Sequence, residues 1–484
     1  MSRSFVRHME RYDLIAIGGG TAGLVTAAGA ATIGLRAALV EREALGGDCL
    51  WTGCVPSKAL IASAKLAHAM RHADRLGLTG AAPSLVFKTV MERMRAARKR
   101  VSEHDDPERF RKMGVDIVFG TAEFETPERI RVDGRIMESK RLVIATGATA
   151  SVPPIEGLAD AGFLTHADAF DQDELPRRIV MLGGGPIGLE FAQIYARLGA
   201  RVTVVEMLPH LLPNEDPEVG RLLEELLIAE GVTVRTGQRV ERVTLRADGS
   251  KTVYVRDATG GEETDTIEAD QLFVATGRRA NTEGLGLEEI GLRLNRGAVA
   301  VDATLRSSIK TIWAAGDVTG GPQFTHVADY QAKLVLRNSV FPFSGKVNYS
   351  AVPSVTYTDP EVARVGLTEL EGRERFGDVM VYRYDFADLD RAIVDVATDG
   401  FVKIVTRPNG RVVGATVVAS GAGNLIMPLV MATKQGMKIS QLSQFVYPYP
   451  TMAEGVKRAA DDYYRQKFAG RTGDWLKKVV RWLR

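Results

Sequence analysis

The chain is poor in cysteine and has almost no net charge. Its 484 residues include only two cysteines, and 62 Lys and Arg against 60 Asp and Glu give a formal net charge of +2. Two cysteines fall short of the four ligands that structural zinc usually takes. So small a net charge gives no overall attraction to nucleic acid, and we expect no such partner. The length suggests roughly three domains.

The chain also lacks a secretory signal. Residues 1–11 show neither an apolar core nor a small-residue cleavage site. We therefore expect a cytoplasmic protein, a location that suits thiols that must be reducible. Residues 14–35 carry no charge and are long enough to suggest a membrane span. Their many glycines, alanines and threonines favour a buried strand, turn and helix instead.

Both cysteines lie in the segment 46–58, which reads GGDCLWTGCVPSK. A disulfide between Cys49 and Cys54 would close so small a loop that it adds little stability, whereas two such thiols can pass electrons to an adjacent acceptor. Two inert, buried thiols are the alternative, because free cysteine packs as a small hydrophobe. The motifs around the segment favour a redox-active pair, and we expect no bound metal.

A dinucleotide-binding pattern precedes this segment. An apolar strand over residues 12–17 is followed by Gly18, Gly20 and Gly23, an alanine-rich helix, and a second strand that ends at Glu41. In this pattern the first glycine makes a tight turn, the second admits a pyrophosphate, and the third lets helix and strand pack closely. The acid can accept a hydrogen bond from a ribose hydroxyl.

The same pattern occurs a second time. The strand 178–182 leads to Gly183, Gly185 and Gly188, and the next strand ends at Glu206, at the same spacing as in the first copy. Each copy is also followed by an apolar strand ending in Ala-Thr-Gly. The last residues of these strands are Gly147 and Gly277. The repeat predicts two related dinucleotide domains.

Glu206 also predicts which nicotinamide cofactor is used. A carboxylate binds the 2′-hydroxyl of NAD and repels the 2′-phosphate of NADP. The residues 207–209 that follow Glu206 supply no cation to compensate. We therefore expect NADH to be preferred over NADPH.

With further motifs, the sequence resembles the pyridine nucleotide–disulfide oxidoreductase family. These motifs are TIWAAGDV at 311–318, VPSVTYTDPE at 352–361 and VGLTE at 365–369. The resemblance implies an α/β fold with two Rossmann-like dinucleotide-binding domains, an α+β C-terminal dimerisation domain, and a homodimer. The implied limits are 1–150 with 281–347 for the FAD-binding domain, 151–280 for the NAD-binding domain, 348–470 for the dimerisation domain, and 471–484 for a basic amphipathic tail.

The resemblance also implies roles for individual residues. Asp317 would hold the flavin ribitol, and the first glycine turn with Glu41 would hold the ADP half of FAD. Lys58 would lie near flavin N5 and pair with Glu190. Cys54 would be the charge-transfer thiol and Cys49 the interchange thiol. Both thiols lie at or before a helix start, which favours thiolate.

One position departs from the disulfide reductases of this family. Their partner subunit supplies a His followed five residues later by a Glu, whereas this sequence has Tyr449 before Glu454. A phenol with a pKa near ~10 is a poor base at neutral pH. This position resembles the mercuric reductase branch, yet the C-terminal cysteine pair of that branch is missing. Simple packing of Tyr449 at the dimer interface is the alternative.

The segment 471–484 predicts a basic amphipathic helix. Trp475, Val479 and Trp482 or Leu483 share one face, and Lys477, Lys478, Arg481 and Arg484 supply positive charge. Such a helix suits an anionic membrane surface, in which case the protein is peripheral to the inner face of the membrane. Docking of this helix on the dimer is the alternative, because an amphipathic face can pack against either protein or lipid.

These observations predict an NAD(P)H-dependent FAD disulfide oxidoreductase. In the favoured hypothesis, electrons pass from NADH through flavin and the Cys49–Cys54 disulfide to an acceptor that the sequence does not identify: a metal ion, a quinone or a small disulfide. One alternative is dihydrolipoamide dehydrogenase with Tyr449 tolerated. Another is a slow-cycling, redox-sensing or membrane-associated flavoprotein.

Overall fold

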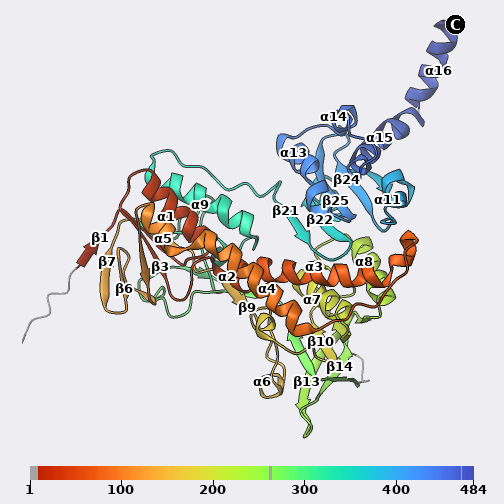
Figure 1. The fold of residues 1–484 in the computed structure, drawn as a ribbon. Helices are drawn as coiled ribbons and strands as arrows, with labels where there is room; N and C mark the ends of the chain where they lie inside the picture. Colours follow the sequence, from red (N-terminus) through yellow and green to blue (C-terminus); the bar gives the residue numbers. More distant parts are fainter. Residues whose placement is uncertain (1–8, 261–263, 470, 484) are drawn as a thin grey trace, which may run out of the picture.

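A computed structural model describes residues 9–260, 264–469 and 471–483. Residues 1–8, part of the segment inspected for a secretory signal, and Arg484 of the tail lie outside the described residues. Among the described residues, no helix is long and apolar enough to cross a bilayer. The chain forms two parallel sheets flanked by helices, followed by an antiparallel sheet with its own helices (Figure 1).

The first parallel sheet combines segments from far apart in the sequence. Its strands, in spatial order, are β20 (Ile312–Ala314), β8 (Leu142–Ile144), β2 (Leu14–Ile17), β3 (Ala37–Glu41) and β4 (Val115–Phe119). β2 is buried along its whole length, as parallel strands covered on both faces are. Helices α1 (Thr21–Thr32) and α9 (Thr325–Val340) pack against each other on this sheet. The uncharged stretch 14–35 is thus a buried strand, turn and helix.

The second parallel sheet repeats this plan. It orders β12 (Thr233–Arg235), β11 (Arg201–Val205), β10 (Arg178–Leu182) and β16 (Gln271–Val274), with α7 (Pro186–Arg197) following β10. An antiparallel meander of β13 (Gln238–Leu245), β14 (Lys251–Asp257) and β15 (Thr264–Ala269) lies between β12 and β16 in the chain. The chain enters and leaves this part through β9 (Ala148–Ala150) and β17 (Arg278–Ala280), which pair antiparallel. The two crossings between the parallel sheets are therefore hydrogen-bonded to each other.

The C-terminal part is α+β. Its antiparallel sheet orders β21 (Pro353–Thr356), β22 (Glu361–Gly366), β25 (Val412–Ala419), β24 (Phe401–Thr406) and β23 (Met380–Asp385). Helices α13 (Met427–Gln435) and α15 (Glu454–Ala469) pack on it, and α16 (Arg471–Leu483) follows α15. The predicted fold class, two Rossmann-like domains and an α+β C-terminal domain, is confirmed.

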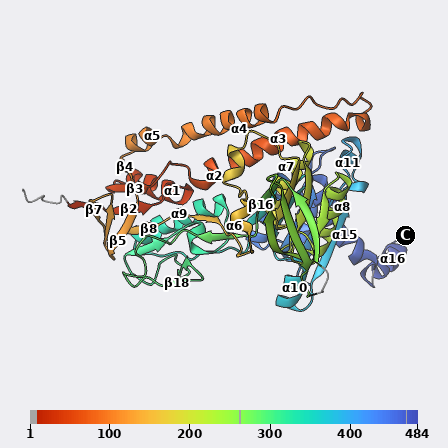
Figure 2. The ribbon, with the colours of Figure 1, turned by 90° about the horizontal axis from the view of Figure 1, so that it is seen from below.

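Two long helices connect the parts. α3 (Cys54–Arg71) starts at the second cysteine, packs against α4 (Phe87–Ser102), and also contacts α7 of the second parallel sheet. Figure 2 shows α3 and α4 running along one side of the molecule. The redox segment thus begins a helix that reaches from one dinucleotide unit to the other.

Candidate active site

A single cavity of about 2390 Å³ joins the two glycine turns and the cysteine segment. The predicted site residues that line it are Gly18, Gly20, Glu41, Cys49, Cys54, Lys58, Gly147, Gly183, Gly185, Glu190, Glu206, Gly277 and Asp317. Gly23 and Gly188 lie behind the turns, and Tyr449 and Glu454 belong to the C-terminal part. The fold therefore gathers most of the predicted residues at one place.

The first glycine turn has the shape that a dinucleotide requires. Gly18 has φ +109°, and a Cβ there would lie 2.3 Å from the Ala145 carbonyl oxygen. A Cβ on Gly23 would lie 1.8 Å from the carbonyl oxygen of Gly18, so only glycine lets α1 approach. A Cβ on Gly20, the residue before α1, would lie no closer than 3.8 Å to any other atom, the nearest being Gly47 Cα. This open space at a helix N-terminus fits the pyrophosphate of FAD.

The second turn repeats these contacts. A Cβ on Gly183 would lie 2.5 Å from the Ala275 carbonyl oxygen, and one on Gly188 would lie 2.1 Å from that of Gly183. At Gly185, before α7, a Cβ would meet nothing within 4 Å. The second cradle therefore fits a dinucleotide for the same reasons.

The acids of the two copies make matching hydrogen bonds. Glu41 accepts from the backbone N–H of Gly19 at 2.6 Å, and Glu206 accepts from that of Gly184 at 2.6 Å. Each carboxylate also accepts from the residue two positions later, at 2.8 Å. A carboxylate has about four acceptor sites, so both acids can still accept from a ribose. The structure adds Arg239 of β13 to the cavity lining, a cation that a search beside Glu206 in the sequence missed.

The two thiols are unequal. Cys54 is the first residue of α3, and Cys49 lies within the short helix α2 (Gly47–Trp51). A hydrogen bond from the Cys49 thiol lowers the pKa of Cys54 to about 6; burial opposes this shift, and the charge of Lys58 supports it. Donating that bond, together with burial, raises the pKa of Cys49. Cys54 is therefore the thiol that ionises first.

Lys58 lies one helical turn after Cys54 and is fixed by an ion pair. Its Nζ is 2.8 Å from Glu190 Oε2, and it lies 4.3 Å from the centre of the Tyr357 ring. The other oxygen of Glu190 accepts from the backbone N–H of Tyr357 at 2.9 Å. Glu190 is buried, and an unpaired carboxylate there would be costly. The pair therefore holds a cation between α3 and α7, on the cavity wall.

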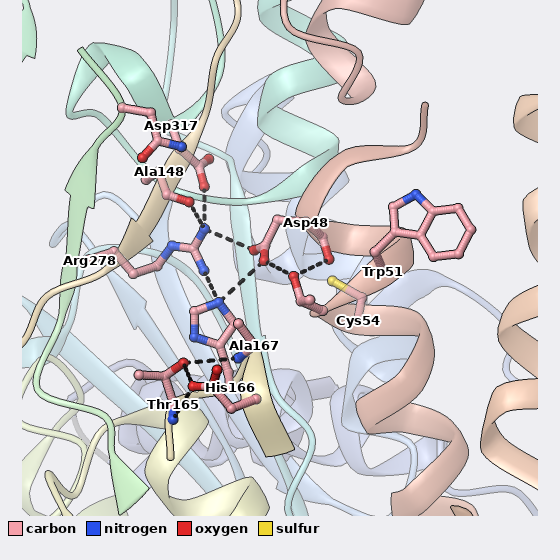
Figure 3. Close-up of polar contacts among 12 residues, drawn as sticks. Asp48, Trp51, Cys54, Ala148, Thr165, His166, Ala167, Arg278 and Asp317 are labelled. Carbon is pink, nitrogen blue, oxygen red and sulfur yellow. Dashed lines mark hydrogen bonds and ion pairs between the residues drawn. The ribbon is translucent and has the colours of Figure 1, made fainter. Parts of the chain in front are cut away.

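A polar network beside the thiols was not anticipated from the sequence (Figure 3). Asp48, next to Cys49, lies 2.8 Å from Arg278 Nη2 and 3.2 Å from His166 Nε2. Arg278 also donates to the Ala148 carbonyl at 2.8 Å and lies 3.4 Å from Asp317. The same Nε2 atom lies 3.2 Å from Arg278 Nη1, so it faces both a hydrogen-bond acceptor, Asp48, and a donor, Arg278. The network joins the redox segment to both crossing strands.

The network changes the acidity of its carboxylates. Burial disfavours ionisation of Asp48, but the hydrogen bond from His166 and the charge of Arg278 together lower its pKa. Burial raises the pKa of Asp317, although Arg278 opposes this. In the sequence, Arg278 directly follows Gly277 and Asp48 directly precedes Cys49. Because Arg278 adjoins the second Ala-Thr-Gly strand and Asp48 adjoins the cysteine segment, these neighbouring motifs could have identified both residues from the sequence.

Tyr449 and Glu454 do not meet the thiols within one chain. The Tyr449 hydroxyl donates to Asp390 at 3.2 Å, and this hydrogen bond raises the pKa of the phenol. Glu454 is buried and accepts from the backbone N–H of Thr451 at 3.4 Å. The Tyr449 side chain is 68% exposed in the single chain, so it is available to a partner subunit.

The sequence matches a family model described as pyridine nucleotide-disulphide oxidoreductase over residues 12–332, and the dimerisation domain of the same family over residues 352–460. The chain belongs to this family. It is an FAD enzyme that uses a pyridine nucleotide, and its dimerisation domain supports a homodimer.

Similar proteins cover the chain almost end to end. A mercuric reductase from Streptomyces lividans is 36% identical over 460 residues, covering 93% of this chain and 96% of the relative. A dihydrolipoyl dehydrogenase from Thermus scotoductus is 34% identical over 472 residues, covering 95% of this chain and 98% of the relative. The solved Cu(II) complex of the HOCl-induced flavoprotein disulfide reductase RclA from Escherichia coli has 28% identity and a TM-score of 0.83, covering 94% of this chain and 99% of that one.

The first prediction concerns the unequal thiols. In the two-electron-reduced protein, we expect Cys54 to titrate near its pKa of about 6 and to give a long-wavelength charge-transfer band above that pH. Cys49→Ala removes the hydrogen-bond donor and should raise this pKa, whereas Cys49→Ser keeps a hydroxyl donor and should raise it less. Absorbance spectra recorded across pH measure both effects: in the wild type after two-electron reduction, and in the Cys49 variants without reduction, because these variants form no disulfide and keep a free Cys54 thiol beside oxidised FAD. Cys54→Ser should abolish the band while FAD remains bound, and an unchanged band would exclude Cys54 from this role.

The second prediction concerns Asp48. Since folding lowers its pKa, its ionisation stabilises the fold above the ordinary aspartate value near ~4, and this contribution declines as the pH falls below that value. The side chain is 35% exposed, so solvent screening limits the effect. Asp48→Asn should lower the free energy of unfolding by about 1–2 kcal/mol at neutral pH and by less in acid.

Urea denaturation of the FAD-loaded protein at several pH values measures this difference. The matched control is Asp160→Asn, at an exposed position of α6 (Leu158–Ala161), which should change stability little at any pH. Equal losses for both variants would show that the Asp48 network does not stabilise the fold.

Proposed function

We propose that this enzyme passes two electrons from NADH, through FAD, to the Cys49–Cys54 disulfide, and from the resulting dithiol to an acceptor other than a conventional dithiol substrate. The observation that carries the proposal is the low pKa of Cys54 on the wall of a cavity shared by two dinucleotide cradles. FAD, when bound, accepts a hydride from the nicotinamide and delivers two electrons to a disulfide. The balance is NADH plus a proton plus the disulfide, giving NAD⁺ and two thiols.

The chain's own residues have distinct tasks in this proposal. The glycine turns and Glu41 bind the ADP half of FAD, while Asp317 holds the ribitol. Glu190 holds Lys58 in place, and the Lys58 ammonium would stabilise negative charge on the flavin ring. Cys54 holds the stabilised thiolate. Cys49 stays protonated to higher pH than Cys54 and passes the electrons of the dithiol to the acceptor.

The same proposal assigns the domains and the cellular location. Residues 1–150 with 281–347 bind FAD, residues 151–280 bind NAD, and residues 348–470 form the dimer interface. The three large sheets support this division. β20 follows the second parallel sheet in the chain but belongs to the first one, so the FAD-binding domain consists of two chain segments. A dithiol that must be reduced in each cycle suits the cytoplasm.

The third prediction tests the choice of NADH over NADPH. Glu206 repels a 2′-phosphate, and Glu206→Gln removes this charge while keeping an oxygen that accepts from Gly184. The variant should lower the NADH-to-NADPH ratio of flavin reduction by roughly 5- to 30-fold, as loss of about 1–2 kcal/mol of discrimination implies. Stopped-flow absorbance under anaerobic conditions measures the ratio.

Glu41→Gln is the matched control for this test, because Glu41 makes the same contact in the first turn. Among molecules that retain FAD, it should leave the ratio at the wild-type value. More efficient flavin reduction of the wild type by NADPH than by NADH, per unit concentration, would contradict the assignment, and Arg239 would then be the cation to examine.

The acceptor is proposed from the chemistry of the dithiol. Relatives named mercuric reductase and a relative solved as a Cu(II) complex favour a soft metal ion, to which thiolates bind well. This sequence has no cysteine beyond Cys49 and Cys54 to deliver mercury, so efficient mercury reduction is not expected. Quinones and small disulfides complete the set. Anaerobic NADH oxidation by the purified flavoprotein, with each acceptor class in turn, discriminates among them.

Dihydrolipoamide oxidation is the second candidate, favoured by the relatives named dihydrolipoyl dehydrogenase. It requires a base near the interchange thiol, and a protonated phenol cannot supply one. A redox sensor is the third candidate. In the acceptor experiment, such a protein would be oxidised stoichiometrically without turnover.

The fourth prediction concerns Tyr449. The hydrogen bond to Asp390 raises the pKa of the phenol, so Tyr449 stays protonated at neutral pH. We expect low turnover with dihydrolipoamide and with glutathione disulfide. Tyr449→His should increase it by about 10- to 100-fold if the dimer places this side chain near Cys49. Steady-state assays of the wild type, Tyr449→His and Tyr449→Phe measure the effect. Rapid dihydrolipoamide oxidation by the wild type, unchanged in Tyr449→Phe, would assign the enzyme to the second candidate.

A further inference from the structure

The last helix, α16, extends away from the rest of the fold. It comprises the 13 residues Arg471–Leu483 and is about 20 Å long. Figures 1 and 2 both show it projecting beyond α15 at the C-terminal end of the molecule. Over these residues the helix is shorter than the stretch of about 20 apolar residues that crosses a bilayer.

One side of α16 is an apolar band, of which Leu476 and Val479 are half-buried and the other members are exposed. At 100° per residue its members fall within an arc of about 160°. The band consists of Trp475, Leu476, Val479, Val480, Trp482 and Leu483. Trp482 is 84% exposed and Trp475 is 63% exposed. A band that holds two exposed tryptophans within one short helix is a surface that some partner covers.

The opposite side of α16 is cationic. It carries Lys477, Lys478 and Arg481, with Asp474 as the acid of this helix. Lys477 and Asp474 form an ion pair within the helix that is long at 3.6 Å, and both side chains are 71% exposed. An exposed pair of this kind interacts weakly, and three cations face one acid, so the polar side of the helix keeps a net positive charge.

The partner subunit is a poor candidate for covering this band. The family's dimerisation domain matches residues 352–460 and therefore ends before α16 begins. Tryptophan side chains with lysines on the opposite face are instead the composition of helices that lie in the headgroup layer of anionic membranes. Tryptophan favours that layer because its ring is apolar and its N–H is polar.

We propose that α16 binds the surface of an anionic phospholipid membrane, with the tryptophan band in the headgroup layer and the cations facing lipid phosphates. The inference goes beyond the redox function and does not depend on the identity of the acceptor. A homodimer carries two such helices, and two linked contacts bind more tightly than one. The membrane therefore recruits the enzyme reversibly.

Co-sedimentation of the full-length, FAD-loaded protein with phospholipid vesicles tests the proposal. We expect binding to vesicles of phosphatidylcholine with phosphatidylglycerol and little binding to phosphatidylcholine alone. Binding should weaken as salt rises from about 0.1 M to about 1 M, because the Debye length shortens from about 10 Å to about 3 Å.

Two variants separate the faces of the helix. Lys477→Glu/Lys478→Glu/Arg481→Glu should weaken binding to anionic vesicles by at least about 100-fold. Trp475→Ser/Trp482→Ser should abolish measurable binding. The matched charge control, Lys88→Glu/Lys99→Glu/Lys112→Glu, changes three exposed cations elsewhere on the surface by the same total charge and should bind as the wild type does.

Three outcomes would overturn the proposal: no binding to anionic vesicles, equal binding by the helix variants and the wild type, or an equal loss in the charge control. Dissociation of the dimer in Trp475→Ser/Trp482→Ser, seen by light scattering without vesicles, would show that α16 covers the partner subunit instead. NADH oxidation with a soluble acceptor reports separately on the redox function, so failure of one proposal leaves the other testable.

Discussion

The site depends on a backbone contact between the first glycine turn and the redox segment. The N–H of Gly46 donates to the carbonyl of Gly19 at 2.8 Å, and a Cβ on Gly47 would lie 2.7 Å from Gly20 Cα. Two chain segments approach this closely only where neither carries a side chain. The contact fixes the thiols against the dinucleotide cradle, and both Gly46 and Gly47 adopt positive φ to make it.

Electrostatics then distinguish two thiols of the same type. Cys54 begins α3, where the helix N-terminus favours an anion, and Lys58 lies one turn further along the same helix. Lys58 is itself held by Glu190 from α7, so its position depends on the packing of two helices from different parts of the fold. Cys49 donates its proton toward Cys54 and is therefore the weaker acid. The fold gives the two sulfur atoms different acidities without any difference in residue type.

A second set of contacts joins this centre to the crossings between the parallel sheets. Arg278 belongs to β17 and contacts β9 through Ala148, while its guanidinium also binds Asp48 beside Cys49. A change in the angle between the two dinucleotide units would therefore strain the same ion pairs that hold the redox segment. The network therefore links the position of the thiols to the two strands that connect the parallel sheets.

The sequence by itself determined the two dinucleotide units, the place of the two cysteines beside the first of them, and the amphipathic tail. Each depends on a local requirement that leaves a mark in the residues: positive φ at Gly18, close helix approach at Gly23, and a helical period in α16. Only the tertiary structure decided which thiol ionises, that Asp48 meets His166 118 positions away, and that Tyr449 meets Asp390. It also decided that Trp475 and Trp482 of α16 stay exposed on their own chain. Side chains from distant segments meet through packing of whole elements, and such meetings leave no periodic pattern in the sequence.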